Sequence, residues 1–167
     1  AQALTLDPSN CNIGVNCETI VGDSSNVLGS EVEALMGASD LSLFYKAEFG
    51  GGEEGYYMDS YTTRFVITSD VGEPSGAVIS YDGAGDIMPC GECYLVVKDG
   101  IHNPSAYIFD ITDWVGDEIV LSDFWLNGGA ISNVAIWGPS ASVPEPAALG
   151  LLGLGLLMLA VSRRRIS

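Results

Sequence analysis

The sequence predicts an all-β fold: an antiparallel β-sandwich or jelly-roll-like domain at residues 1–142, followed by a segment, 143–167, that contains one C-terminal hydrophobic α-helix. Apolar and polar residues alternate with a period of two along much of the first segment, and turn signals separate short strands at roughly ten-residue spacing. The second segment instead contains sixteen consecutive uncharged residues, 147–162, rich in leucine and glycine.

The clearest strand is 41–49, where every odd position is apolar and three of the four even positions are polar. This pattern is typical of a strand with one face on a core. A glycine-rich turn follows at 50–55, and the alternation returns at 60–69 with Tyr61, Phe65 and Ile67 on one face. We therefore predict that 41–49 and 60–69 pair as a hairpin with a long loop.

Further strands are predicted from short runs of β-branched and aromatic residues between Gly, Asn and Asp turn signals. They cover 77–81, 94–98, 106–111, 118–121 and 131–137. The one helix expected before the C-terminal segment is 30–36, where Ser30 and Glu33 have the spacing of a capping box. The alternation places six side chains inside the sandwich: Leu41, Leu43, Phe65, Ile67, Val134 and Ile136.

The uncharged run has a defined start and end. Glu145 and Pro146 suit a first helical turn, where proline needs no N–H and an acid faces the positive end of the helix dipole. The arginines at 163–165 suit the opposite end and mark the cytoplasmic side of a membrane segment. The helix would be roughly 24 Å long, slightly less than the roughly 30 Å hydrocarbon core, and arginine stems can cover the difference. Such a helix needs a bilayer or protein neighbours to cover it.

These features together resemble the PEP-CTERM sorting segment of exported bacterial proteins, which joins a Val-Pro-Glu-Pro motif to a Leu/Gly-rich transmembrane run and an arginine cluster. The matching parts here are 147–161 and the residues Pro144, Glu145, Pro146, Arg163, Arg164 and Arg165. The resemblance implies export across the inner membrane of a Gram-negative cell and recognition by an exosortase-type transpeptidase near Pro-Glu-Pro. It also implies a destination at the cell surface or in an extracellular matrix such as a biofilm. It implies nothing about residues 1–142.

The charge is strongly acidic and uneven. All 22 acidic residues precede Ala147, but among the six basic residues only Lys46, Arg64 and Lys98 do, which gives this part of the chain a net charge of −19. Such a surface does not attract nucleic acid or an anionic membrane. It suits a soluble protein outside the cell, and a start at Ala1 is what removal of a signal peptide would leave. The length allows one domain with its own core.

Four cysteines form two close pairs, and in an exported chain an even number of cysteines indicates disulfides. We predict the bonds Cys11–Cys17 and Cys90–Cys93. Two alternatives remain open. Four thiolates could bind zinc, although the spacing of the first pair is wide for this. The second pair could be a redox motif, although such a motif would open a helix and a strand is predicted directly after it.

Residue patterns typical of catalytic and metal sites are sparse. His102 is the only histidine and lies in a turn between predicted strands, so we predict no histidine-based catalysis and no enzyme. Carboxylate pairs for glycoside hydrolysis depend on distances that a sequence does not display. Asp82 and Asp86 flank glycines as in a Ca²⁺-binding loop, but the full ligand series of an EF-hand is missing. We expect no cofactor, with Ca²⁺ at these two aspartates as the alternative.

Two function classes follow. The first is an exported structural protein of the cell surface or matrix that self-assembles as a homo-oligomer or filament, with its C-terminal helix buried between subunits or in the membrane. The second is a carbohydrate-binding module that retains matrix polysaccharide, because aromatic rings can stack on sugars. The aromatic candidates for this second role are Tyr56, Tyr57, Tyr61, Trp114, Trp125 and Trp137.

Overall fold

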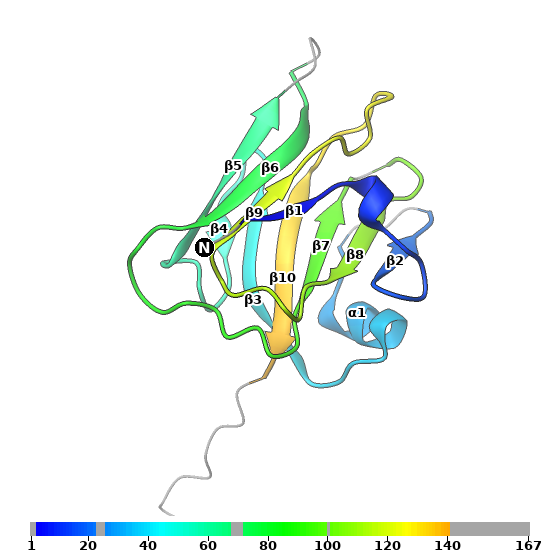
Figure 1. Cartoon of the computed structure of the whole chain (residues 1–167). Coiled ribbons are helices and arrows are strands. Elements are labelled where there is room, and N and C mark those ends of the chain that lie inside the picture. Colours follow the sequence, from blue (N-terminus) through cyan, green and yellow to red (C-terminus); the bar gives the residue numbers. More distant parts are fainter. Residues whose placement is uncertain (1–2, 23–25, 68–71, 100, 141–167) are drawn as a thin grey trace, which may run out of the picture.

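Two β-sheets face each other across a shared apolar core (Figure 1). The structure is a computed structural model that describes residues 3–22, 26–67, 72–99 and 101–140. The predicted two-sheet, mostly antiparallel architecture is confirmed. The predicted helix at 147–161 lies outside the described residues. Among those that are described, no helix has the length and apolar character needed to cross a membrane.

The smaller sheet has the strand order β1-β9-β6-β5, and the larger has the order β2-β8-β7-β10-β3-β4. The smaller sheet consists of β1 (Leu4–Leu6), β9 (Glu118–Leu121), β6 (Pro74–Tyr81) and β5 (Tyr61–Ile67). The larger sheet consists of β2 (Cys17–Ile20), β8 (Ala106–Asp110), β7 (Tyr94–Lys98), β10 (Asn133–Pro139), β3 (Leu41–Glu48) and β4 (Glu53–Glu54). Only β1 and β9 pair in parallel among the described strands. The described helices are a 3₁₀ turn, η1 (Pro8–Asn10), and α1 (Gly29–Met36).

The main core lies between the sheets. Ile79 and Ile119 from the smaller sheet and Leu95 and Ile136 from the larger are fully buried there. Burial of each such side chain stabilises the fold by about 1.5–3 kcal/mol. Gly138 on β10 is required by packing, because a methyl group at this position would overlap the ring of Phe44.

A second apolar cluster covers part of the opposite, outer face of the larger sheet. Val32 of α1 is fully buried there against Tyr94, Val96, Ile108 and Ala135. Figure 1 shows α1 at the end of the sandwich where β10 finishes. The larger sheet is therefore covered on both faces, but the outer cover is a helix of only eight residues.

The predicted hairpin between 41–49 and 60–69 is wrong. β3 pairs with β10 and β4, whereas β5 pairs with β6 in the other sheet. The residues between β3 and β5 carry the chain from one sheet to the other, and the glycine-rich stretch predicted as a turn contributes β4. Glu53 ties the sheets together, because its Oε1 accepts hydrogen bonds from the Tyr45 hydroxyl at 2.8 Å and from the Thr63 N–H at 3.0 Å.

A β-bulge in β3 makes the predicted core positions Leu41 and Leu43 wrong. Trp137 lies opposite Leu43 and Ile136 opposite Tyr45, so Phe44 is an extra residue in the strand. The bulge shifts the alternation, so that Leu41 and Leu43 contact the cluster under α1 while both Phe44 and Tyr45 enter the main core. An alternation read without the bulge places 41 and 43 on the wrong face.

The remaining core predictions have mixed outcomes. Val134 and Ile136 are fully buried in the main core, as predicted, and Phe65 packs against it while partly exposed. Ile67 is 51% exposed, because the pairing of β5 with β6 shifts between Val66 and Ile67. The prediction for Ile67 is therefore wrong.

Helix α1 is confirmed, but its predicted capping box is not. The N–H of Leu28 donates to Glu31 Oε2 at 2.9 Å, two residues earlier than predicted from Ser30 and Glu33. The carboxylate of Glu33 instead accepts a hydrogen bond from the N–H of Leu41 at 2.7 Å. Glu33 therefore fixes the approach of the chain to β3 and does not cap the helix.

Candidate functional sites

The predicted sorting residues, Pro144, Glu145, Pro146, Arg163, Arg164 and Arg165, lie outside the described residues. The last described residue, Ser140, is held firmly: its N–H donates to the Asp40 carbonyl at 2.7 Å, and its Oγ lies 2.6 Å from Ser42 Oγ. Only three residues separate Ser140 from Pro144, and a fully extended chain across that gap reaches roughly 14 Å. A protein that recognises the Pro-Glu-Pro motif must therefore approach the end of the sandwich where β10 finishes (Figure 1).

Both predicted disulfides are present, with S–S distances of 2.03 Å for Cys11–Cys17 and 2.09 Å for Cys90–Cys93. In each pair the second cysteine is buried at the start of a strand, since Cys17 begins β2 and Cys93 directly precedes β7. The sulfurs are bonded in pairs and are not the free thiolates that a zinc site would use. The disulfides fasten two short loops to the larger sheet.

The two aspartates considered for Ca²⁺ lie in the exposed turn after β6. Asp82 Oδ1 accepts a hydrogen bond from the N–H of Ala84 at 2.7 Å, so this carboxylate stabilises the turn itself. Within the described residues, no group of three or more His, Cys, Asp or Glu side chains could hold a metal ion. Calcium binding at Asp82 and Asp86 stays a prediction.

The aromatic candidates for sugar stacking are not gathered on one surface. Tyr57, Tyr61 and Trp114 are buried in the main core, where the Tyr61 hydroxyl donates to the carbonyl of Gly116 at 2.6 Å. Tyr56 is 80% exposed, and Trp125 is partly buried against the main core. Trp137 lies alone among them on the outer face of the larger sheet.

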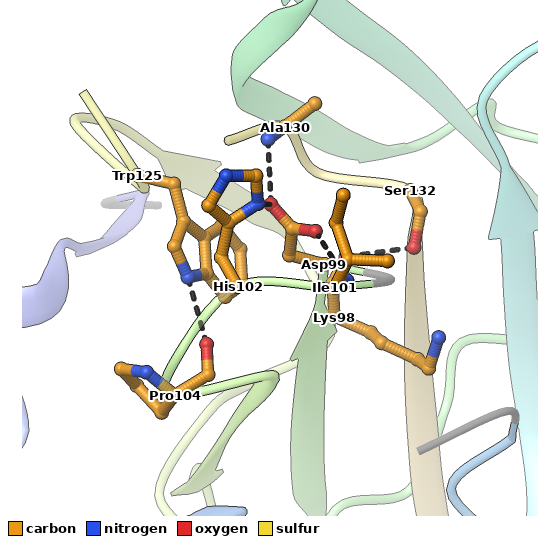
Figure 2. A network of polar contacts seen from close by, with 8 residues as sticks. All are labelled: Lys98, Asp99, Ile101, His102, Pro104, Trp125, Ala130 and Ser132. Atoms are coloured by element: carbon orange, nitrogen blue, oxygen red, sulfur yellow. Dashed lines mark hydrogen bonds and ion pairs between the residues drawn. The ribbon is translucent and has the colours of Figure 1, made fainter. Parts of the chain in front are cut away.

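His102 belongs to a polar network that closes the loop after β7 (Figure 2). At its centre is Asp99, which is 4% exposed. Its Oδ1 accepts a hydrogen bond from the N–H of Ile101 at 3.0 Å, and its Oδ2 accepts one from the N–H of Ala130 at 2.8 Å. His102 Nδ1 lies 3.0 Å from the same Oδ2, which is ion-pair distance when the imidazole is protonated. Asp99 thus joins two loops.

The electrostatics of the network favour an ionised Asp99. Burial alone would raise the pKa of this carboxyl, but the N–H groups of Ile101 and Ala130, together with His102, hold it below its ordinary value. Next to the carboxylate, the indole N–H of Trp125 donates to the carbonyl of Pro104 at 2.8 Å. The contacts of Asp99 are therefore those of a structural anchor.

An aspartate, a histidine and a serine occur together in Figure 2, but they are not arranged as a catalytic triad. Ser132 Oγ donates to the carbonyl of Lys98 at 3.0 Å, and Ser132 and His102 lie on opposite sides of the Asp99 carboxylate. The prediction that this protein is not an enzyme stays a prediction. Sequence reasoning missed Asp99 because it interpreted residues 99–100 only as a turn. The available signal was an acid directly after the predicted strand 94–98.

Comparison with known proteins identifies a PEP-CTERM protein-sorting motif at residues 142–165. This confirms the resemblance seen in the sequence and its position after the β-domain. No curated protein and no solved structure matches the chain.

Proposed function

We propose that this protein, which carries a PEP-CTERM sorting motif, is a non-catalytic structural protein of the cell surface or extracellular matrix. The motif itself suggests export to the cell envelope or surface and processing by an exosortase. Ser140 is hydrogen-bonded to Ser42 of β3, and only three residues separate it from Pro144. The sorting motif therefore follows a domain with its own core after a short connection, and this observation carries the proposal.

The acidic surface supports a displayed, soluble domain. Lys46 Nζ is paired with Glu48 at 2.6 Å and with Glu54 at 2.8 Å, and Lys98 is 5% exposed. Among the described residues, this leaves Arg64 as the one basic side chain that is largely open to solvent. Net charge far from zero keeps a protein soluble and disfavours contact with nucleic acid.

The apolar run at 147–162 supports retention or assembly. A stripe of this length exceeds the few hundred Å² of contiguous apolar surface that monomeric soluble proteins expose. A bilayer covers it while the chain is anchored, and the same segments of neighbouring copies cover it in a homo-oligomer or filament. The tail therefore decides where the domain is held.

The test is deletion of residues 144–167 in a host that has the sorting machinery. The shortened chain should be secreted as a soluble, folded monomer, because the strands between Leu4 and Pro139 contain their own core. The full chain should instead be found with membranes or as high-mass polymer. A full-length protein with a verified intact C-terminus that is a monodisperse monomer without detergent would contradict the proposal.

A matched variant separates sorting from hydrophobicity. Replacing Pro144, Glu145 and Pro146 together by alanine keeps the apolar run and the arginines. This variant should stay in the inner membrane unprocessed, whereas the parent chain reaches the surface. Equal surface display of both chains would show that the motif is not the sorting signal.

The second candidate function is carbohydrate binding in the matrix. The position of Trp137 on the outer face of the larger sheet favours it, because this is the one tryptophan among the candidates that packs outside the main core.

A further inference from the structure

A groove lies on the outer face of the larger sheet, next to the part that α1 covers. Strand register builds its floor: Ala135 of β10 lies between Val96 of β7 and Lys46 of β3, and Lys46 lies opposite Glu54 of β4. One wall comes from the residues that lead into α1. The groove has a volume of ≈ 210 Å³. Its lining residues are Asn26, Val27, Leu28, Leu43, Lys46, Glu54, Val96, Asn133, Ala135 and Trp137.

The groove combines apolar and polar groups in separate places. Leu43 and Trp137 form a partly exposed apolar base, and Val96 and Ala135 beside them are almost fully buried. Asn133 and the ion pair of Lys46 with Glu54 stand around this base. A ligand for such a surface needs one apolar face and several hydroxyl groups around its edge.

Trp137 has a hydrogen-bonding capacity that the protein does not use. Its indole N–H is buried and has no acceptor among the described residues. The ring is fixed from the helix side, since a methyl group added to Gly29 would lie 2.9 Å from its Cζ3 atom. Buried donors almost always have a partner, so a ligand oxygen that displaced the atoms covering this N–H would satisfy it.

The charges of the groove favour a neutral ligand. Lys46 Nζ is already balanced by Glu48 and Glu54, at 2.6 and 2.8 Å. Desolvation alone would lower the pKa of this ammonium group, but the two carboxylates outweigh it and raise the pKa, so Lys46 stays charged. An acidic ligand would meet these carboxylates and a chain whose residues before Ala147 carry a net charge of −19. Hydroxyl groups, by contrast, can both donate to carboxylates and accept from an ammonium.

We propose that this groove binds one ring of a neutral saccharide, with the apolar C–H face of the sugar on Leu43 and Trp137. Its oxygen atoms would bind Asn133, Lys46, Glu54 and the indole N–H of Trp137. Sites for drug-sized ligands occupy about 300–1,000 Å³. The volume of this groove, ≈ 210 Å³, therefore suits a smaller ligand such as a single sugar ring. The site gives the second candidate function a location. Whether the groove binds a saccharide is independent of the sorting proposal, because none of the groove residues belongs to the C-terminal segment.

The test is native gel electrophoresis of the full chain, in a detergent without a sugar head group, through gels that contain one polysaccharide each. The probes are a neutral glucan, mannan, galactan and soluble N-acetylglucosamine polymer, with a polyuronate as the acidic comparison. At least one neutral polymer should retard the protein and the polyuronate should not. Lack of retardation by all four neutral polymers, or retardation by the polyuronate alone, overturns the proposal.

Two variants and one control locate the binding. Trp137→Phe keeps a ring under α1 but removes the N–H, and Asn133→Ala removes an edge amide; each should weaken retardation about tenfold. Trp114→Phe removes another buried indole N–H without an acceptor among the described residues, but outside this groove, and should leave retardation unchanged. Circular dichroism confirms that each variant is folded. If folded Trp137→Phe and Asn133→Ala both bind as well as the parent, the site is not this groove.

Discussion

The two faces of the larger sheet differ although they share the same strands. Toward the smaller sheet, Val134 and Ile136 of β10 are fully buried in a continuous core. On the other side of the same strand, one short helix covers part of the face, and Asn133, Ala135 and Trp137 line an open groove. One face is closed along its length, whereas the other is closed at one end only.

The difference shows how a single strand can serve two purposes. Because successive side chains point to opposite faces, substitutions at 134 and 136 act on the main core, while those at 133, 135 and 137 act on the outer face. We therefore expect the inner face to determine global stability. The outer face should tolerate local change, and this freedom leaves space for a ligand.

The largest effect is expected from a truncation on the inner face. Ile136→Ala removes a fully buried side chain from the main core and should lower the free energy of unfolding by about 2–5 kcal/mol. Leu28→Ala is the control on the outer side, since Leu28 is 57% exposed, and it should change stability by less than about 0.5 kcal/mol. Urea denaturation of both variants measures this; equal losses would refute the contrast between the faces.

A second large effect is expected at Asp99, which joins the loop after β7 to the residues before β10. Asp99→Ala removes the acceptor for the N–H groups of Ile101 and Ala130 and should cost about 2–4 kcal/mol. Because folding lowers the pKa of Asp99, its contribution is present above the ordinary carboxyl pKa of about 4 and is lost as the pH falls through the lower folded value. The stability difference between the parent and Asp99→Asn should therefore shrink in acid. A difference that is independent of pH would show that the charge is irrelevant.

A smaller and more local effect is expected under α1. Val32→Ala should cost about 1–2 kcal/mol, since it removes two methyl groups from a cluster beside a helix that can shift to fill the space. Hydrogen exchange should show faster opening of α1 while the amides of β10 stay protected. Loss of protection in both elements together would mean that the outer cluster is part of the global core.

The smallest effect concerns two tyrosines on the two faces. Burial and the nearby carboxylate of Glu92 raise the pKa of Tyr94 on the outer face to about 12. Burial also raises the pKa of Tyr45 on the inner side. A raised tyrosine pKa stabilises the fold below the ordinary value of about 10, and this stabilisation is lost as the pH rises through the folded value. Ultraviolet titration of Tyr94→Phe should lack one phenol that ionises near pH 12 in the parent.

The sequence was sufficient to predict features that depend on neighbouring residues. The bounds of β7 and β9 follow from short β-branched runs between turn signals, and the two disulfides follow from the spacing of the cysteines. Pairing over long distances was not predictable in this way. The alternation in 60–69 is the same whether the strand pairs with β3 or with β6, and one extra residue at Phe44 reverses the faces of β3.

The groove shows the same limit. Its polar groups come from β3, β4, β10 and the chain before α1, and only the register of the larger sheet brings them together. Among these residues, sequence reasoning named Trp137 alone as a candidate for binding sugars, as one of six aromatics. Lys46 was named only as one of three basic residues before Ala147, and its partner Glu54 could be identified only after β4 was found.

Glu53 has a consequence for how copies of this protein can meet. Strand β5 is one of the two edge strands of the smaller sheet, and an open edge is a template on which another chain can add a strand and seed fibril growth. The Glu53 carboxylate already occupies the N–H of Thr63 in the middle of that edge. A second molecule would have to displace it, so merging of the smaller sheets of two copies at this edge is disfavoured. In the assembly proposed above, the C-terminal segments would bring copies together while the sheets of each sandwich stayed separate.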